Sequence, residues 1–193
     1  MRGRVLYLNS MFCQDQILSY ILELKTSVIL PLEILKQSEK KDLHMSHLEV
    51  SHDNGIATLT MNRPEARNAL SMEMRSELCS VLHDIERDAS VRCVVLKGAG
   101  DHFMAGGDVK GMGESIKKPP EEIRKEFMLR IHDLHPIMFA MRRMPKPIIA
   151  SCQGAAAGAG VSMALACDLV IASEDAFFPL AYCKIGTSPD GSS

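Results

Sequence analysis

Residues Gly154–Asp168, GAAAGAGVSMALACD, determine how the chain is organised. An apolar run, Pro147–Cys152, precedes them and is typical of a buried strand. Seven residues made only of Gly and Ala come next, and Val161–Ala166 then has the pattern of a helix start. A turn without side chains lets backbone N–H groups approach a ligand, and the first N–H groups of a helix lack internal partners. We therefore expect this turn to bind negative charge, either on a phosphate or on an oxygen during a reaction.

Length and composition fit one soluble globular domain. The chain has 193 residues, of which 46% are hydrophobic and 24% charged. Its net charge of −2 gives no reason to expect nucleic acid or an anionic membrane as a partner. No uncharged run approaches the roughly 18 residues that a membrane span needs. The six cysteines form no CxxC pair, which favours reduced thiols in an intracellular protein; they are Cys13, Cys79, Cys93, Cys152, Cys167 and Cys183.

The first 44 residues differ in pattern from the rest. Arg2 and Arg4 precede an apolar stretch, which faintly resembles a transit peptide, but the sequence from Asp15 to Lys41 is interrupted by charges. Met45–Leu48 is typical of a second start. We interpret residues 1–44 as an extension outside the native fold, with a targeting segment as the alternative, and residues 45–193 as the core.

Strand and helix patterns alternate through this core. Two alternating runs, Leu48–Val50 and Ile56–Met61, flank Asn54-Gly55 and predict a hairpin. Ser71 is expected to cap a helix to about Arg87. The apolar face of that helix would consist of Met74, Leu78, Val81, Leu82 and Ile85.

The remaining elements follow the same order. Further strands are expected at Val91–Leu96, Pro147–Cys152 and Leu169–Ala172. Glu121–Met144 predicts a longer helix that Pro136 should kink or restart, with Phe127, Ile131, Leu134, Met138 and Met141 on one side. Glycine-rich or polar loops are expected at His102–Gly113 and Lys184–Asp190. Strands alternating with helices predict an α/β fold built from ββα units.

Several familiar sites fit this sequence poorly. A dinucleotide motif placed on Gly158–Met163 has Met163 where the third glycine is needed for close packing, and no Gly-Lys-Ser/Thr follows for a P-loop. His132 and His135 are three residues apart on a helix but have no acidic or Cys partner at ligand spacing, so no metal site is expected. Cys183 would be a nucleophile only with a histidine near it in space.

A second glycine-rich segment, Phe103–Asp108, gives the first one a partner. Each segment follows a predicted core strand, and strands of the same direction end at the same edge of a sheet. One N–H from each turn could therefore converge on a single oxygen and form an oxyanion hole. The alternative is two tight turns that need glycine for steric reasons alone.

Together these pieces resemble the crotonase superfamily, the enoyl-CoA hydratase/isomerase family, over Leu48–Ser193. The matching motifs are Asn62-Arg63-Pro64 with Asn68-Ala69-Leu70, then Phe103–Asp108, then Gly154–Asp168. The resemblance implies a crotonase-like ββα superhelix that binds acyl-CoA thioesters as homotrimers or hexamers. No cofactor is expected beyond the coenzyme A of the substrate. The cytoplasm is the expected compartment, with mitochondria and peroxisomes as alternatives.

The resemblance also implies site residues. The oxyanion N–H groups fall on Gly107 and Ala159. Arg67 and Lys110 would suit the phosphates of coenzyme A, although both could equally be solvated surface charges. Coenzyme A would run along Ala66, Arg67, Ala105, Gly107, Asp108, Val109 and Lys110. Asp108 is a weaker acid candidate that is expected to order its own loop.

The proton-transferring group separates the alternative reactions. Hydratases of the family use two glutamates, and this chain has Ser162 and Tyr182 at those places. Asp190 resembles the aspartate of family isomerases and could shuttle one proton; otherwise it is a turn residue after Pro189. We expect an isomerase-like enzyme, with a hydratase using Asp190 and Tyr182 as the first alternative. The second is a non-catalytic CoA-binding remnant, because the sequence stops before the family's C-terminal helices.

Overall fold

The computed structural model describes residues 4–6, 43–44, 47–115, 117–189 and 191. These residues all belong to one of the two units into which the chain divides. Within the predicted extension over residues 1–44, the described pieces are two short strands, β1 (Arg4–Leu6) and β2 (Leu43–His44). Cys13 and the rest of that extension lie outside the described residues, so the interpretation of residues 1–44 stays a prediction.

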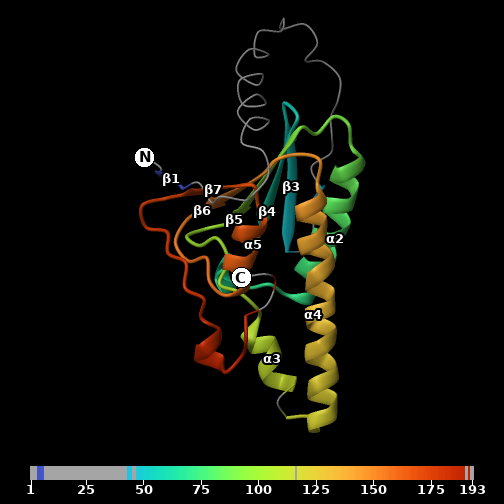
Figure 1. Ribbon diagram of the computed structural model, residues 1–193, viewed down its shortest axis with the longest axis vertical. Coiled ribbons are helices and arrows are strands. Elements are labelled where there is room, and N and C mark those ends of the chain that lie inside the picture. Colours follow the sequence, from blue (N-terminus) through green and yellow to red (C-terminus); the bar gives the residue numbers. More distant parts are fainter. Residues whose placement is uncertain (1–3, 7–42, 45–46, 116, 190, 192–193) are drawn as a thin grey trace, which may run out of the picture. The chain divides into compact units, whose positions relative to one another are not determined.

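The described residues form one seven-stranded sheet in the order β1-β7-β6-β5-β4-β3-β2 (Figure 1). Its other strands are β3 (Leu48–Asp53), β4 (Ile56–Met61), β5 (Cys93–Gly98), β6 (Ile148–Cys152) and β7 (Leu169–Ala172). The four strands β4 to β7 are parallel, whereas β1, β2 and β3 pair antiparallel with their neighbours. Because β5 and β6 are parallel neighbours, the glycine-rich segments that follow them lie at the same edge of the sheet, as predicted.

The predicted hairpin is confirmed. Asp53 pairs with Ile56, which leaves Asn54 and Gly55 as a two-residue loop between β3 and β4. Both loop residues have positive φ, 48° at Asn54 and 81° at Gly55. That combination is the type I′ turn, whose twist matches the twist of the two strands, and Asn-Gly is its preferred sequence.

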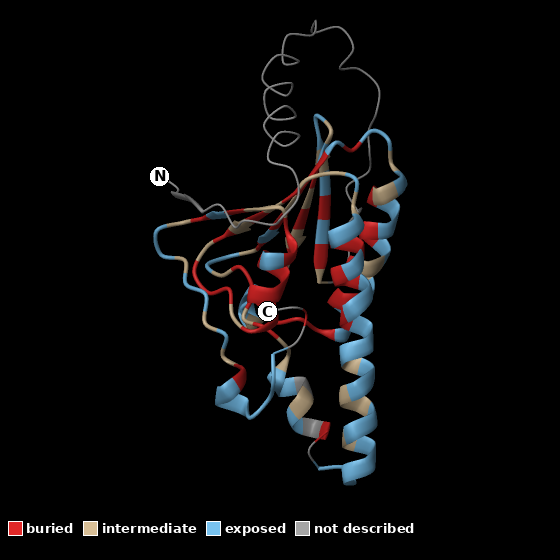
Figure 2. Cartoon of the chain, in the orientation of Figure 1, coloured by how far each residue is buried: buried red, intermediate tan, exposed pale blue. Residues whose placement is uncertain are grey.

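The predicted helix after Ser71 is also confirmed, as α2 (Met72–Arg87). The Ser71 hydroxyl accepts a hydrogen bond from the N–H of Met74 at 3.1 Å, which satisfies one of the helix's orphan donors. The five predicted apolar residues are all buried in the hydrophobic core, which residues of α4 (Pro120–Arg143) also join, and Figure 2 shows buried positions on α2 among exposed ones. The five residues are Met74, Leu78, Val81, Leu82 and Ile85.

The long helix α4 (Pro120–Arg143) is continuous. Of the two outcomes expected at Pro136, a kink or a restart, the restart is therefore wrong, and the kink stays a prediction. Pro136 is exposed, and water can satisfy the carbonyl that the proline leaves without an N–H partner. The buried residues of α4 lie in its second half, from Leu134 to Met141. Ile131 is 40% exposed, although the predicted apolar face included it.

Two predicted loops contain helical turns. Val109–Ser115 forms the short helix α3 inside the expected loop over His102–Gly113, and Tyr182–Ile185 forms the 3-10 turn η2. Gly111 and Gly113 lower the local helix propensity of α3, which explains the wrong prediction. The focal turn leads into α5 (Ala159–Ala166), which begins two residues before the predicted start at Val161.

Candidate active site

Backbone hydrogen bonds join the two glycine-rich turns. Met104 and Ala156 form a parallel bridge between them. The N–H of Met104 donates to the carbonyl of Ala155 at 3.0 Å, and the N–H of Ala157 donates to the carbonyl of Met104 at 2.8 Å. The prediction that the two turns lie together is therefore confirmed.

This close approach requires glycine on both sides. Gly106 has a φ of 101°, and a Cβ there would lie 2.8 Å from the carbonyl oxygen of Ala157. A Cβ at Gly160, on the other turn, would overlap the carbonyl oxygen of Met104. Steric need thus explains part of the glycine pattern. It does not explain why both turns open on the same cavity.

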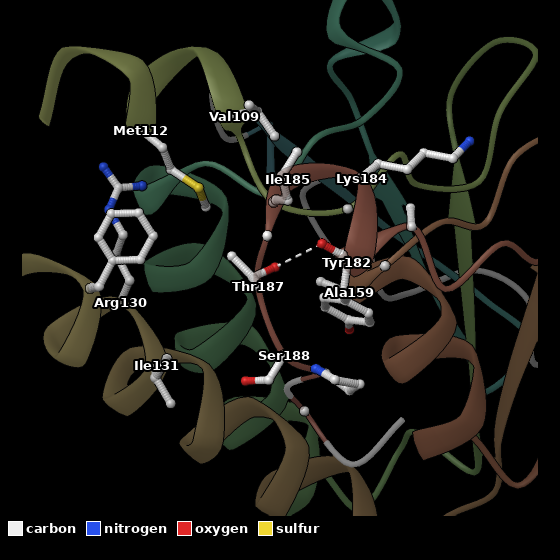
Figure 3. Close-up of a pocket in the computed structure, with 18 of the residues that line it drawn as sticks. Val109, Met112, Arg130, Ile131, Ala159, Tyr182, Lys184, Ile185, Thr187 and Ser188 are labelled. Carbon is white, nitrogen blue, oxygen red and sulfur yellow. Dashed lines mark hydrogen bonds between the residues drawn. The ribbon is translucent and has the colours of Figure 1, made fainter. Parts of the chain in front are cut away.

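The cavity has a volume of about 830 Å³ and lies beside the two turns (Figure 3). Ala105, Gly107 and Ala159 line it, as does Val109 at the start of α3. Within the described part of the chain, the turn and loop hydrogen bonds use neither the N–H of Gly107 nor that of Ala159. Ala159 is the first residue of α5, so its N–H is one of the donors that a helix cannot satisfy itself.

Other residues predicted to bind coenzyme A surround the first turn. The N–H of Ala105 donates to the carbonyl of Arg67 at 2.9 Å, and the N–H of Leu70 donates to the carbonyl of Gly106 at 2.8 Å. Arg67 and Lys110 are exposed, and the cavity lining includes neither of them, nor Ala66 or Asp108. The structure therefore places Ala66, Arg67 and Lys110 around the turn, outside the cavity wall.

Asn68 connects this loop to the turn after β5. Its side chain is fully buried, and its amide donates to the carbonyls of Ala99 and His102 at 2.9 and 2.7 Å. Its carbonyl oxygen accepts from the N–H of Arg63 at 2.9 Å. The asparagine of the Asn68-Ala69-Leu70 motif thus acts as a structural bridge.

Asp108 forms an ion pair with Arg63. Their Nη1 and Oδ2 atoms are 3.0 Å apart, with 16% and 20% of the two side chains exposed. The same Nη1 donates to the carbonyl of Ala69 at 2.8 Å. This pair fixes the end of the first turn against the loop that contains Arg63.

Tyr182 lines the cavity and contacts Ser162. Their hydroxyl oxygens are 3.1 Å apart and both residues are buried. Gly191 packs on Ser162, because a Cβ at Gly191 would lie 2.9 Å from the Ser162 Cβ. Asp190 itself lies outside the described residues, but Pro189 and Gly191 on either side of it in sequence line the cavity.

Sequence reasoning missed the opposite wall. Met112 of α3 and Phe127 and Ile131 of α4 provide apolar surface there, and Figure 3 shows Met112, Arg130 and Ile131 on this side. Arg75 is 5% exposed and donates a hydrogen bond to the carbonyl of Arg130. The only sequence signal for this wall was that Phe127 and Ile131 were expected to face the core. Arg75 had no signal, because arginine on a surface helix is usually exposed.

Of the histidines and cysteines considered as candidates, only His135 is among the described residues that line the cavity. His135 lines the cavity and its ring contacts that of Phe139, whereas His132 is exposed. Among the described residues, no three metal-binding side chains lie together in a cluster. Cys183 is exposed, while Cys93, Cys152 and Cys167 are buried, and burial raises the pKa of the Cys152 thiol to about 12.

None of the helices in the described part is long and apolar enough to cross a membrane.

Comparisons with known proteins identify the family of the chain. The family described as enoyl-CoA hydratase/isomerase matches residues 51–193. The chain is 38% identical over 146 residues to 1,2-epoxyphenylacetyl-CoA isomerase of Escherichia coli, covering 76% of this chain and 53% of that protein. It is 37% identical over 147 residues to 4-chlorobenzoyl coenzyme A dehalogenase-1 of an Arthrobacter species, with coverages of 76% and 52%.

A solved structure gives the same result. An enoyl-CoA hydratase from Polaromonas sp. JS666 superimposes with a TM-score of 0.68 at 37% identity, covering 75% of this chain and 55% of that chain. The predicted crotonase-like fold is therefore confirmed. The chain spans about half the length of the curated relatives that it matches.

Proposed function

The chain belongs to the enoyl-CoA hydratase/isomerase family, and from this premise we propose that its site binds an acyl-CoA thioester and stabilises the enolate of that thioester. One observation carries the proposal: Gly107 and Ala159, on two paired turns, line one cavity with N–H groups that the described turn and loop hydrogen bonds leave unused. Removal of a proton beside a thioester carbonyl drives negative charge onto its oxygen. Two preorganised N–H donors offset that charge, each by about 3 kcal/mol in other enzymes.

The names of the relatives support the substrate class. One is an isomerase and another is a dehalogenase, so their reactions differ, but both names specify a coenzyme A thioester. The shared element is thus the thioester. Since coenzyme A arrives with the substrate, the proposed reaction needs no separate cofactor.

We assign the proton transfer to Asp190. Its sequence neighbours Pro189 and Gly191 line the cavity, and the described lining residues include no carboxylate. The carboxylate would remove a proton from C2 of a 3-enoyl-CoA, and the electron pair would move onto the thioester oxygen. Return of the same proton to C4 would then give the 2-enoyl-CoA, so the step is balanced without water or an oxidant.

Replacement of Asp190 by Asn tests this assignment. We expect 3-enoyl-CoA isomerisation to fall at least about 100-fold, the usual contribution of a positioned acid/base, with acyl-CoA affinity retained. Asp133→Asn, at an exposed carboxylate of α4, is the control and should isomerise at the normal rate. A near-normal rate in Asp190→Asn would exclude Asp190 as the base.

Water addition is the second candidate, because Tyr182 lines the cavity and has its hydroxyl 3.1 Å from that of Ser162. If Tyr182 assists water, Tyr182→Phe should reduce hydration of a 2-enoyl-CoA and leave isomerisation of a 3-enoyl-CoA intact. Acyl-CoA binding without either reaction would identify a non-catalytic binding module. A homotrimer or hexamer stays a prediction, which sedimentation equilibrium would test.

A further inference from the structure

His102 lies between the two turns, directly before Phe103. Its Nδ1 atom is 3.1 Å from the backbone nitrogen of Ala155, in the turn that follows β6. A backbone N–H can only donate, so Nδ1 must be the acceptor in this contact. The ring is therefore the neutral tautomer that carries its proton on Nε2.

This contact adds one hydrogen bond to the series of backbone hydrogen bonds that joins the two turns. The neighbouring bond in that series runs from the N–H of Phe103 to the carbonyl of Gln153, at 2.8 Å. The ring also lies directly against the turn, since a Cβ at Gly154 would be 2.5 Å from Nδ1. His102 is thus the side chain that fixes the start of the turn leading to Ala159.

We propose that His102 is a positioning residue whose neutral imidazole holds the Gly154–Gly160 turn in register with the Phe103–Asp108 turn, and whose protonation releases it. A protonated ring carries N–H on both nitrogens, so Nδ1 can no longer accept from Ala155. Two donors would then face each other. The consequence for catalysis rests on the proposed function, because this turn ends at the Ala159 N–H.

Two carboxylates, those of Asp175 and Asp101, add negative charge near the ring. Asp175, in the segment after β7, interacts electrostatically with His102. The Ser173 hydroxyl donates to Asp175 at 2.5 Å, and this bond first, followed by bonds from backbone N–H groups, lowers the pKa of Asp175. Asp175 therefore stays ionised in the range where imidazoles take up a proton, between about pH 5 and 8. Asp101, adjacent and exposed, adds a second negative charge. The neutral ring thus has the Ala155 N–H as its hydrogen-bond donor, and Asp175 is a nearby negative charge.

Nitrogen-15 NMR on the full chain tests the proposal without any activity assay. Between about pH 8 and 5, the Ala155 amide resonance should shift together with the His102 ring nitrogens as the ring takes up its proton. In His102→Asn the side-chain oxygen can accept the same hydrogen bond but does not titrate, so the Ala155 shift should stay constant. His132→Asn, at an exposed α4 histidine, should behave like the wild type. The proposal would be overturned if the Ala155 amide shift did not change while the His102 ring titrated. It would also be overturned if the His102 ring carried its proton on Nδ1 at neutral pH.

Binding of acetoacetyl-CoA, whose enolate carries charge on the thioester oxygen, gives the functional readout. Between about pH 7.5 and 5.5 the wild-type affinity should fall roughly tenfold more than that of His102→Asn, the ratio that one lost hydrogen bond produces. Protonation of the ligand itself affects both proteins equally and cancels in this comparison. His102→Leu, with no acceptor, should bind weakly at both pH values; if it does not fold, the Asn variant still decides. If His102→Asn showed the wild-type decline, the proposal would be wrong.

The two proposals can fail separately. If no variant bound acetoacetyl-CoA at any pH while the Ala155 amide still followed His102, the proposed function would fail and the positioning role would stand. If the wild type bound it and the Ala155 amide were independent of pH, the positioning role alone would be rejected.

Discussion

The turn over Gly154–Gly160 is almost entirely buried and is held by backbone hydrogen bonds, whereas the turn over Phe103–Asp108 is partly exposed and ends in an ion pair. The buried turn is bonded to Met104, Phe177 and Pro179, and it leads into the apolar helix α5. The partly exposed turn leads into α3, which carries two glycines. Close backbone packing therefore fixes the side of the cavity formed by Gly154–Gly160. The side formed by Phe103–Asp108 is held by an ion pair and by α3, a helix of low helix propensity. We expect substitutions to have much larger effects on the first side.

The largest effect is expected from Ala159→Pro. Ala159 is the first residue of α5, a position where proline fits the helix and where its ring replaces the N–H by a CH2 group. Loss of one oxyanion donor should lower the isomerisation rate about 100- to 1,000-fold, which steady-state kinetics would measure. Ala159→Gly keeps the N–H and is the control. Equal rates in the two variants would show that this N–H does not act on the thioester.

The next effect separates the two helices that follow the turns. Gly160→Ala should lower the free energy of unfolding by about 3 kcal/mol, because its Cβ would overlap the Met104 carbonyl. Gly113→Ala in α3 meets nothing within 4 Å and should raise that free energy by about 0.5 kcal/mol. Urea unfolding measures both. Similar costs at the two sites would contradict the distinction between the two turns.

A smaller effect is expected at the ion pair. Asp108→Asn should lower the free energy of unfolding by about 1 kcal/mol, because the pair with Arg63 is mostly shielded from water. The control is Glu86→Gln, since Glu86 pairs with Arg143 at a more exposed site, where about 0.3 kcal/mol is expected. Equal losses of unfolding free energy in the two variants, measured by urea unfolding, would show that the Arg63–Asp108 pair stabilises the protein no more than an exposed ion pair does.

The smallest effect concerns Cys152, at the end of β6 before the buried turn. Its pKa is raised by burial to about 12 in the folded protein, against about 8.5 for a free thiol. Its contribution to stability is thus complete below about pH 8.5 and is lost as pH rises towards 12. At about pH 9 the loss is about 0.8 kcal/mol, and Cys152→Ala should reduce this pH dependence in urea unfolding. Cys183→Ala, at an exposed thiol, should leave it unchanged.

Elements with a local sequence signal were predictable. The hairpin follows from Asn54-Gly55 and the start of α2 from Ser71, since each residue type favours its local backbone geometry. The two turns were visible because few other residues could occupy such close backbones. The family resemblance, not the local pattern, assigned roles to Gly107 and Ala159.

Features that depend on distant contacts were not predictable. The hydrogen bonds from Ala155 to His102 and between Ser162 and Tyr182 join residues 53 and 20 positions apart. No periodicity or spacing reports such pairs. For α3 and for the continuous helix through Pro136, local propensity pointed to a loop and a break, and tertiary context overrode it. The buried Arg75 is a third case, because the helical pattern alone gives an arginine an exposed position.

The central claim is that the two turns polarise a thioester carbonyl. Isotope-edited infrared spectroscopy of an acyl-CoA labelled with carbon-13 at that carbonyl tests it most directly, because hydrogen bonds to the oxygen weaken the C=O bond. On binding, the stretching frequency should fall below its value in water, and Ala159→Pro should reverse part of that shift. A bound thioester that absorbs as it does in water, with no response to Ala159→Pro, would contradict the account.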